Sequence, residues 1–362
     1  MVKRAALILA GGKARRFQSK GEDWQDKALV ELDEKPLLIH AVQNVQGVVN
    51  EVAVCVNDEE RRAVYTKILD RNALSKVKIV VDEKISHISG PNLAIMSGLK
   101  SLQADFCLTL PCDMPFLEPK VAEYLFNVAE GFEVTVPMWH NGRLETLMMV
   151  LERQTALEIA ETLCMLRRPR SDDIPRGAGK TLLVSPVNHI KTLDPELRSF
   201  ININSKEDLS RLQTRRSHGP VMENVRLNLG VLSISDLRIL REGAKMFYEG
   251  KVLDAKKIFA FCSSNFEVCE SHFWAGLAKE NLGDALLTLA HKHSESESGV
   301  KLDSQGKDAL LRATNNYRLE AEIYENNRCL LLAERALADK AWCEAWAMGK
   351  QSQAHRYSRN VA

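Results

Sequence analysis

Two stretches of this sequence carry residue types that suit phosphate chemistry. The first is an apolar run at residues 5–10 that stops at Gly11 and Gly12. Several cationic residues follow the two glycines: Lys13, Arg15, Arg16 and Lys27. A glycine turn lets the backbone lie directly against a ligand, and backbone N–H groups together with side-chain cations bind phosphate oxygens. We therefore expect a nucleoside triphosphate to bind at this turn.

The second stretch, residues 105–116, is an apolar run that delivers Asp113 at its end and continues with Pro115. Mg²⁺ takes one or two protein carboxylates and completes its shell with substrate phosphates, so a single carboxylate at a strand tip is sufficient. The same aspartate could instead cap the next helix. Beside a glycine turn, the magnesium interpretation is favoured.

Neither common phosphate-loop pattern is present. The residues after Gly11 do not give G-x-G-x-x-G, and the nearest candidate for a Walker loop, residues 179–181, has Ile174 where that pattern needs its first glycine. The triphosphate site must therefore belong to another class of nucleotide-binding loop.

The elements that position these residues are apolar runs separated by helical segments. Residues 5–10, 51–56, 77–82 and 105–111 are typical of buried parallel strands, and a helix begins at residue 37. Polar residues follow these strands, where open α/β sheets bind their ligands: Asn57, Asp82 and Asp113. The alternative role for Asn57 or Asp58 is a helix N-cap. The pattern predicts a three-layer α/β fold with a mostly parallel sheet.

Three motifs in this order resemble those of one enzyme family. Leu-Ala-Gly-Gly-x-x-x-Arg-Phe at residues 9–17, Asp-Lys-Ala-Leu at 26–29 and Phe-x-Asn-x-Asn-Ser at 200–205 resemble the MobA-like nucleotidyltransferases, the molybdenum cofactor guanylyltransferase type. That family belongs to the glycosyltransferase-A-like superfamily, with a Rossmann-like sheet. The resemblance covers about residues 1–215.

The resemblance implies a role for each matching residue. The nucleotide-binding set is Leu9, Ala10, Gly11, Gly12, Lys27, Asn57, Asp82 and Asp113. The catalytic set is Arg16, Lys27 and Asp113, and Mg²⁺ is held by Asp113 with Asn202 or Asn204. For binding the acceptor, the resemblance implies Glu145. We expect the cation-rich stretch 166–177 to be a loop. Arg176 in that stretch is a further candidate for binding an anionic acceptor, and the alternative is that the stretch is solvated surface.

The sequence departs from the family pattern at a few places. Residues 18–25 lengthen the link between the glycine turn and Lys27, and the expected Gly-Pro-Leu-Ala-Gly element has Asn92 for Leu and Ile95 for Gly. Thr146 stands where the family has Pro after the acceptor-site glutamate.

Composition limits the partners. The 362 residues carry a formal net charge of +1, which gives no general argument for nucleic acid or an anionic membrane as a partner. The N-terminal apolar run is too short for a signal-peptide core or a membrane span, so we expect a cytoplasmic protein. The eight cysteines form no C-x-x-C pair, which favours small buried residues over a zinc site.

The sequence changes character at residues 214–220, a basic stretch with Gly and Pro, so we expect one domain over 1–215 and a second over 216–362. The second shows no strand-like runs. Amphipathic helices are expected at residues 234–249, 252–262, 270–282, 309–324 and 328–347. Small residues at the helix crossings and Gly-containing turns resemble tetratricopeptide units, which suggests a protein partner.

The predicted reaction transfers NMP from an NTP to a phosphorylated acceptor and releases pyrophosphate. The family resemblance favours GTP and molybdopterin as the pair. Cytidylyl transfer to molybdopterin, cobinamide phosphate or a sugar phosphate as acceptor, and a nucleotide-sensing binding protein without turnover remain alternatives.

Overall fold

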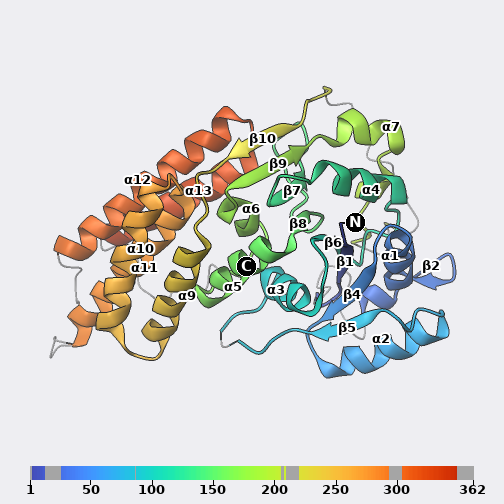
Figure 1. Cartoon of the computed structure of the whole chain (residues 1–362), viewed down its shortest axis with the longest axis horizontal. Helices are drawn as coiled ribbons and strands as arrows, with labels where there is room; N and C mark the ends of the chain where they lie inside the picture. The colour runs from blue at the N-terminus through green and yellow to red at the C-terminus, as the bar shows by residue number, and fades with distance from the viewer. Residues whose placement is uncertain are drawn as a thin grey trace.

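The computed structural model describes residues 2–12, 26–85, 87–204, 208, 220–292 and 304–348. The predicted catalytic residue Arg16 and the inserted stretch 18–25 lie outside these residues. Figure 1 shows a layered α/β part and a group of long helices, α10–α13, gathered at the end of the molecule away from α1 and α2.

The described residues form an eight-stranded sheet in the order β10-β9-β7-β8-β6-β1-β4-β5. Its strands are β1 (Arg4–Leu9), β4 (Glu51–Val56), β5 (Lys78–Val81), β6 (Phe106–Pro111), β7 (Val134–Pro137), β8 (Val150–Glu152), β9 (Lys180–Val184) and β10 (Val225–Asn228). Strands β6, β1, β4 and β5 run parallel, whereas β8 is antiparallel to both β6 and β7. The predicted mostly parallel α/β sheet is confirmed.

Helices cover both faces of this sheet, because the strand side chains are apolar on both sides. In β1, Ala5 and Leu7 belong to one buried cluster, and Ala6 and Ile8 belong to another on the opposite face. The first face packs against α3 (Pro91–Ser101) and α5 (Arg153–Met165). The second packs against α1 (Leu37–Gln46), α2 (Glu59–Arg71) and α4 (Pro119–Val128). The result is the predicted three-layer arrangement.

The helical part begins with α9 (Ile234–Tyr248) and α10 (Val252–Val268). It continues with α11 (His272–Lys292), α12 (Ser304–Asn326) and α13 (Leu330–Ala347). All five correspond to helices predicted from the sequence. Each packs against the next, and α9 also packs against α5. One hydrophobic cluster runs from Leu7 in the sheet to Leu237, Trp274 and Tyr324, so these helices share a core with the α/β part.

Three local predictions are wrong. The pattern of residues 200–204 predicts a strand, but Phe200 ends the 3-10 turn η3 (Arg198–Phe200) and residues 201–204 belong to no strand of the described sheets. The stretch 166–177 is no solvated loop, since it contains the helix α6 (Asp173–Gly177) and residues 171–178 are buried. A strand, β10, occurs after residue 216, where we expected only helices.

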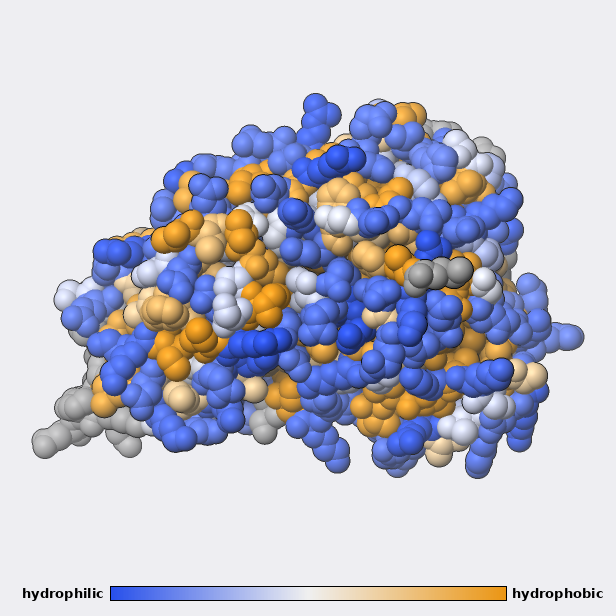
Figure 2. Space-filling model, in the orientation of Figure 1, coloured by the Kyte–Doolittle hydropathy of each residue, from blue (hydrophilic) through white to orange (hydrophobic). Residues whose placement is uncertain are grey.

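Figure 2 shows polar residues over most of one face, with apolar residues in separate patches. Among the described helices, none is long and apolar enough to span a bilayer.

Candidate active site

The glycine turn and Asp113 lie at the same edge of the sheet. Strands β1 and β6 are adjacent and parallel, with Leu9 opposite Pro111, and the Cys112 N–H donates to the Leu9 carbonyl at 3.1 Å. Gly11 and Gly12 leave β1 where Asp113 leaves β6. A single triphosphate can therefore contact both, which is the geometry that a nucleotidyl transfer needs.

Three of the predicted site residues meet at this edge. Lys27, in the 3-10 turn η1 (Lys27–Leu29), forms an ion pair through Nζ with Asp113 Oδ2 and donates to Asn204 Oδ1 at 2.9 Å. The Ile203 N–H donates to the Asp113 carbonyl at 2.9 Å, which joins the 201–204 segment to the tip of β6. Lys27 and Asp113 keep side-chain exposures of 14% and 19%, so a ligand can reach both.

The oxygens at this point suit a hard cation. Asp113 Oδ2 and Asn204 Oδ1 both contact the Lys27 ammonium, so one carboxylate and one amide oxygen already converge on a positive charge. Asn202 Oδ1 is buried and accepts no hydrogen bond. No group of three or more His, Cys, Asp or Glu suited to a metal occurs in the part of the chain that the structure describes. These oxygens suit a Mg²⁺ ion whose coordination shell is completed by substrate phosphates, and they are too few to hold a metal ion without a substrate.

Asn57 and Asp82 lie against the glycine turn. A Cβ on Gly11 would be 3.4 Å from the Asn57 nitrogen and 3.8 Å from Asp82 Oδ2, so the absence of a side chain at Gly11 leaves the turn close to both. Asp58 caps α2 by accepting from the Arg61 N–H at 2.8 Å, which leaves Asn57 outside the cap. Burial raises the pKa of Asp82 to about 7, and its Oδ1 accepts no hydrogen bond.

Arg61 and Tyr65 on α2 hold the two ends of the glycine loop, and the sequence analysis missed both. Arg61 donates to the Ala10 and Gly12 carbonyls at 3.2 Å each, and its Nε lies 3.4 Å from Asp26 Oδ2. The Tyr65 hydroxyl donates to the same Asp26 oxygen at 2.9 Å. Asp26 in turn caps η1, where Lys27 lies. Arg61 thus fixes the distance between the glycine turn and Lys27.

We expect Arg61→Met to lower NTP affinity about tenfold, because charge-assisted hydrogen bonds at both ends of the loop are lost. Tyr65→Phe removes one hydroxyl from Asp26 and leaves Arg61 in place, so we expect a smaller loss. Thermal stabilisation by each NTP, measured over a concentration series, gives both affinities. Equal affinities in Arg61→Met and the wild type would contradict this role.

Glu145, the residue predicted to contact the acceptor, is buried beside Trp139. Trp139 Nε1 donates to Glu145 Oε1 at 2.6 Å, and the Trp139 ring stacks edge-on to Phe200 at 5.3 Å. Trp139 and Glu145 belong to a hairpin over residues 138–146, in which Met138 bridges Leu144 and the Trp139 N–H donates to the Arg143 carbonyl at 2.8 Å. Phe200 lies next to the segment 201–204 that carries Asn204, so this hairpin adjoins the edge where Lys27, Asp113 and Asn204 meet.

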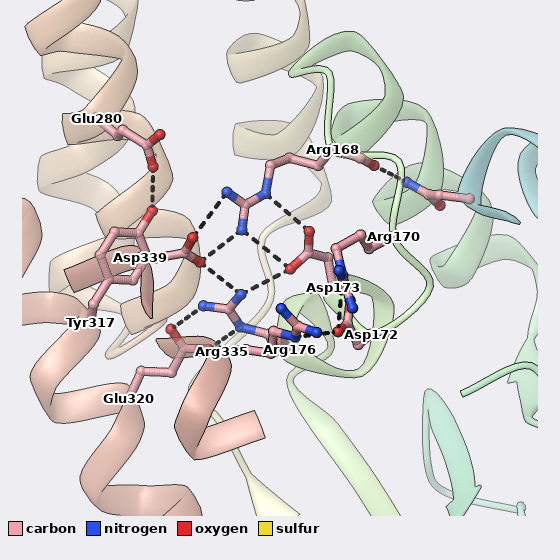
Figure 3. Close-up of polar contacts among 11 residues, drawn as sticks. Arg168, Arg170, Asp172, Asp173, Arg176, Glu280, Tyr317, Glu320, Arg335 and Asp339 are labelled. Carbon is pink, nitrogen blue, oxygen red and sulfur yellow. Dashed lines mark hydrogen bonds and ion pairs between the residues drawn. The ribbon is translucent and has the colours of Figure 1, made fainter. Parts of the chain in front are cut away.

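Arg176 lies elsewhere. Figure 3 shows its guanidinium inside a cluster of carboxylates, where it pairs with Asp173, Glu320 and Asp339. Its side chain is 1% exposed, and the pairing carboxylates come from the chain itself. The Arg176 guanidinium is therefore paired inside the protein and is not free to bind an anionic acceptor.

Residues 6–171 match the family described as the MobA-like NTP transferase domain. A probable molybdenum cofactor guanylyltransferase from Methanosarcina acetivorans is 31% identical over 210 residues, which are 58% of this chain and 89% of that protein. The chain belongs to the MobA-like NTP transferase family. It is accordingly a nucleotidyltransferase, and the resemblance noted from the motifs is confirmed.

Other members of the MobA-like family give the same coverage. The probable molybdenum cofactor guanylyltransferase of Methanosarcina mazei is 30% identical and covers 58% of this chain and 89% of its own length. Among solved structures, molybdopterin-guanine dinucleotide biosynthesis protein A from Archaeoglobus fulgidus is similar, with a TM-score of 0.46 and 21% identity over 57% of this chain and 95% of that one.

Proposed function

We propose that this enzyme transfers GMP from GTP to molybdopterin in a Mg²⁺-dependent reaction that releases pyrophosphate. The supporting observation is that the glycine turn, Lys27, Asp113 and Asn204 converge at one edge of the sheet. The names of the related proteins favour molybdopterin as the acceptor and guanine as the base.

In the proposed mechanism, the terminal phosphate of the acceptor attacks the α-phosphorus of the NTP in line, and pyrophosphate leaves. Lys27, with Arg16, offsets the negative charge that develops on the leaving pyrophosphate. Asp113 with Asn202 or Asn204 would hold Mg²⁺, which supplies charge stabilisation at the α-phosphate when it is bound. The acceptor phosphate is already anionic at neutral pH, so no general base is needed.

Asp82 is the group that we propose to select the base. Guanine presents two adjacent N–H donors, N1–H and N2–H, to a carboxylate, whereas the matching edge of cytosine offers one donor beside an acceptor nitrogen. Asp82 lies next to the glycine turn with one oxygen buried and unpaired, which suits a purine that donates twice. The free-energy cost of burying the Asp82 carboxylate is then offset only when the base of a bound nucleotide donates hydrogen bonds to it.

We expect Asp82→Asn to bind GTP about tenfold more weakly and yet to be more stable than the wild type at pH 8. The pKa of Asp82 is raised to about 7 in the folded chain, so the native state binds more protons than the unfolded state between about pH 4 and 7. This group therefore lowers stability as pH rises through that window. The gain in melting temperature should be present at pH 8 and vanish near pH 4.

The proposed function is tested with purified enzyme, Mg²⁺, molybdopterin and each of the four NTPs. We expect pyrophosphate release and a molybdopterin dinucleotide with GTP. Formation of the product with CTP alone would identify the cytidylyl alternative. Tight NTP binding without turnover across molybdopterin, cobinamide phosphate and sugar phosphates would identify a nucleotide sensor.

The cytoplasmic location is part of the same proposal. All eight cysteines are free, and most are buried, as expected in a reducing compartment.

A further inference from the structure

The segment 168–177 is fastened to the C-terminal helices by buried ion pairs (Figure 3). Arg176 makes a two-pronged contact with Glu320 of α12, at 2.7 and 3.0 Å, and reaches Asp339 of α13 at 2.8 Å. Arg168 also contacts Asp339, at 2.7 Å, and both arginines contact Asp173. Two helices thus hold one segment of the transferase part.

Further contacts hold the same segment in place. Arg335 of α13 lies 2.8 Å from Asp172, and Trp274 of α11 donates to the Gly177 carbonyl at 2.7 Å. A Cβ at Gly177 would be 2.7 Å from the Trp274 ring, so the segment and α11 pack without free space. Buried charges held by partners on two sides permit few alternative arrangements.

The held segment contacts the α/β part through two residues that depart from the family pattern, Asn92 at the start of α3 and Thr146 in the hairpin that carries Glu145. The Asn92 side chain donates to the Arg168 carbonyl at 2.8 Å, and the Asn92 N–H donates to the Pro169 carbonyl at 3.1 Å. Thr146, the residue after Glu145, accepts from the Ser171 hydroxyl at 3.1 Å. The unusual Asn and Thr are therefore partners of the segment that the helices hold.

A second contact reaches the same hairpin from its tip. The Leu331 N–H, in the first turn of α13, donates to the Gly142 carbonyl at 3.2 Å. A Cβ at Gly142 would lie 2.4 Å from the Leu330 nitrogen, and Gly142 has a φ of +75°. Only glycine allows α13 to approach this closely. The hairpin that carries Trp139 and Glu145 is thus braced at both ends by elements tied to the helical part.

We propose that the C-terminal helices position the acceptor side of the transfer site, with Asp339 as the positioning residue that joins both arginines to α13. This inference rests on the proposed function, together with the acceptor contact that the family resemblance implies for Glu145 in the 139–146 hairpin. The glycine turn, Asn57 and Asp82 are linked to the held segment only indirectly, through α3, whose first turn contains Asn92 and which packs against β4 and β5. The hairpin is contacted directly, so we expect the acceptor to respond more strongly than the nucleotide when the helices are loosened.

Asp339→Asn tests this by replacing one carboxylate oxygen with an N–H₂ donor that faces the arginines. We expect the KM for molybdopterin to rise about tenfold while the KM for GTP stays unchanged. Asp308→Asn is the matched control, since it makes the same change in an exposed pair with Arg312 on α12. Thr146→Val, which removes only the bond to Ser171, should raise the molybdopterin KM as well and tests the same link without disturbing the helices.

Amide hydrogen exchange of the apo enzyme gives a readout independent of turnover. In Asp339→Asn we expect faster exchange in residues 139–146 and 168–177 and unchanged exchange in residues 51–57. An equal rise in both KM values, or unchanged exchange at 139–146, would overturn the proposal. If the wild type transfers nucleotide to no acceptor, the proposed function fails, and the exchange pattern alone decides whether the helices hold the hairpin.

Discussion

Replacing Asp113 by alanine should lower the rate of nucleotidyl transfer about 100-fold or more, which corresponds to about 3 kcal/mol of transition-state stabilisation. Asp113 contacts Lys27 at the edge where the glycine turn also ends, and Asn204 lies on the same ammonium. Removing this carboxylate takes away the strongest candidate metal ligand and leaves the Lys27 charge without its partner. The turnover number with GTP and molybdopterin measures the effect.

Asp105→Ala provides the matched control, because Asp105 lies just before the other end of the same strand β6. Its carboxylate accepts from the Lys3 N–H at 2.8 Å and is exposed, far along the strand from the glycine turn. We expect its transfer rate to equal that of the wild type. Near-normal turnover in Asp113→Ala would remove the assignment of the metal to this edge.

The second large effect concerns stability. Arg176→Met should lower the free energy of unfolding by about 3–5 kcal/mol, since it leaves buried carboxylates without their cation. Glu320 and Arg176 are both buried, so water cannot replace the lost partner. Arg318→Met on α12 removes an exposed pair with Glu322 and should cost about 0.5 kcal/mol. Urea unfolding of both variants measures the difference.

This loss should depend on pH in a defined direction. Burial raises the pKa of Glu320, and the charge of Arg176 opposes that rise. Burial also acts to raise the pKa of Asp339, but Arg168 and Arg176 outweigh it and hold this pKa below its usual range. Without Arg176, Glu320 binds a proton more readily in the folded state than in the unfolded state, whereas Asp339 keeps Arg168 as its partner. The variant should therefore lose stability as pH rises, with a larger deficit at pH 8 than at pH 5. A constant deficit would indicate lost packing alone.

Much of the fold could be predicted because its signals are local. The apolar runs ending at Gly11, Asn57, Asp82 and Asp113 are strands whose ends meet at one edge, and the periodic apolar positions after residue 230 gave the helices. The convergence of Lys27, Asp113 and Asn204 could be expected from two family motifs, at 26–29 and 200–205, and from the apolar run that ends at Asp113, each carried by residues next to one another in the sequence.

The missed features depend on partners that are distant in sequence. Arg61 sits on a helix with little amphipathic character, and nothing near it indicates that it binds the carbonyls of Ala10 and Gly12. A cation-rich stretch such as 166–177 suits either an anionic acceptor or a solvated surface, whereas the partners that Arg176 actually has, Glu320 and Asp339, lie more than 140 residues away. Four-residue β10 alternates in polarity too briefly to be distinguished from a loop.

Strand β10 limits how this chain can be shortened. It pairs antiparallel with β9, and Leu227 and Leu229 are buried in the cluster that continues into the helices. A protein ending at residue 215 would lack β10, so its β9 would present unpaired N–H and C=O groups at the edge of the sheet. Such a fragment is expected to self-associate, so poor yield or inactivity of that fragment would reflect an open sheet edge and not a defect in catalysis.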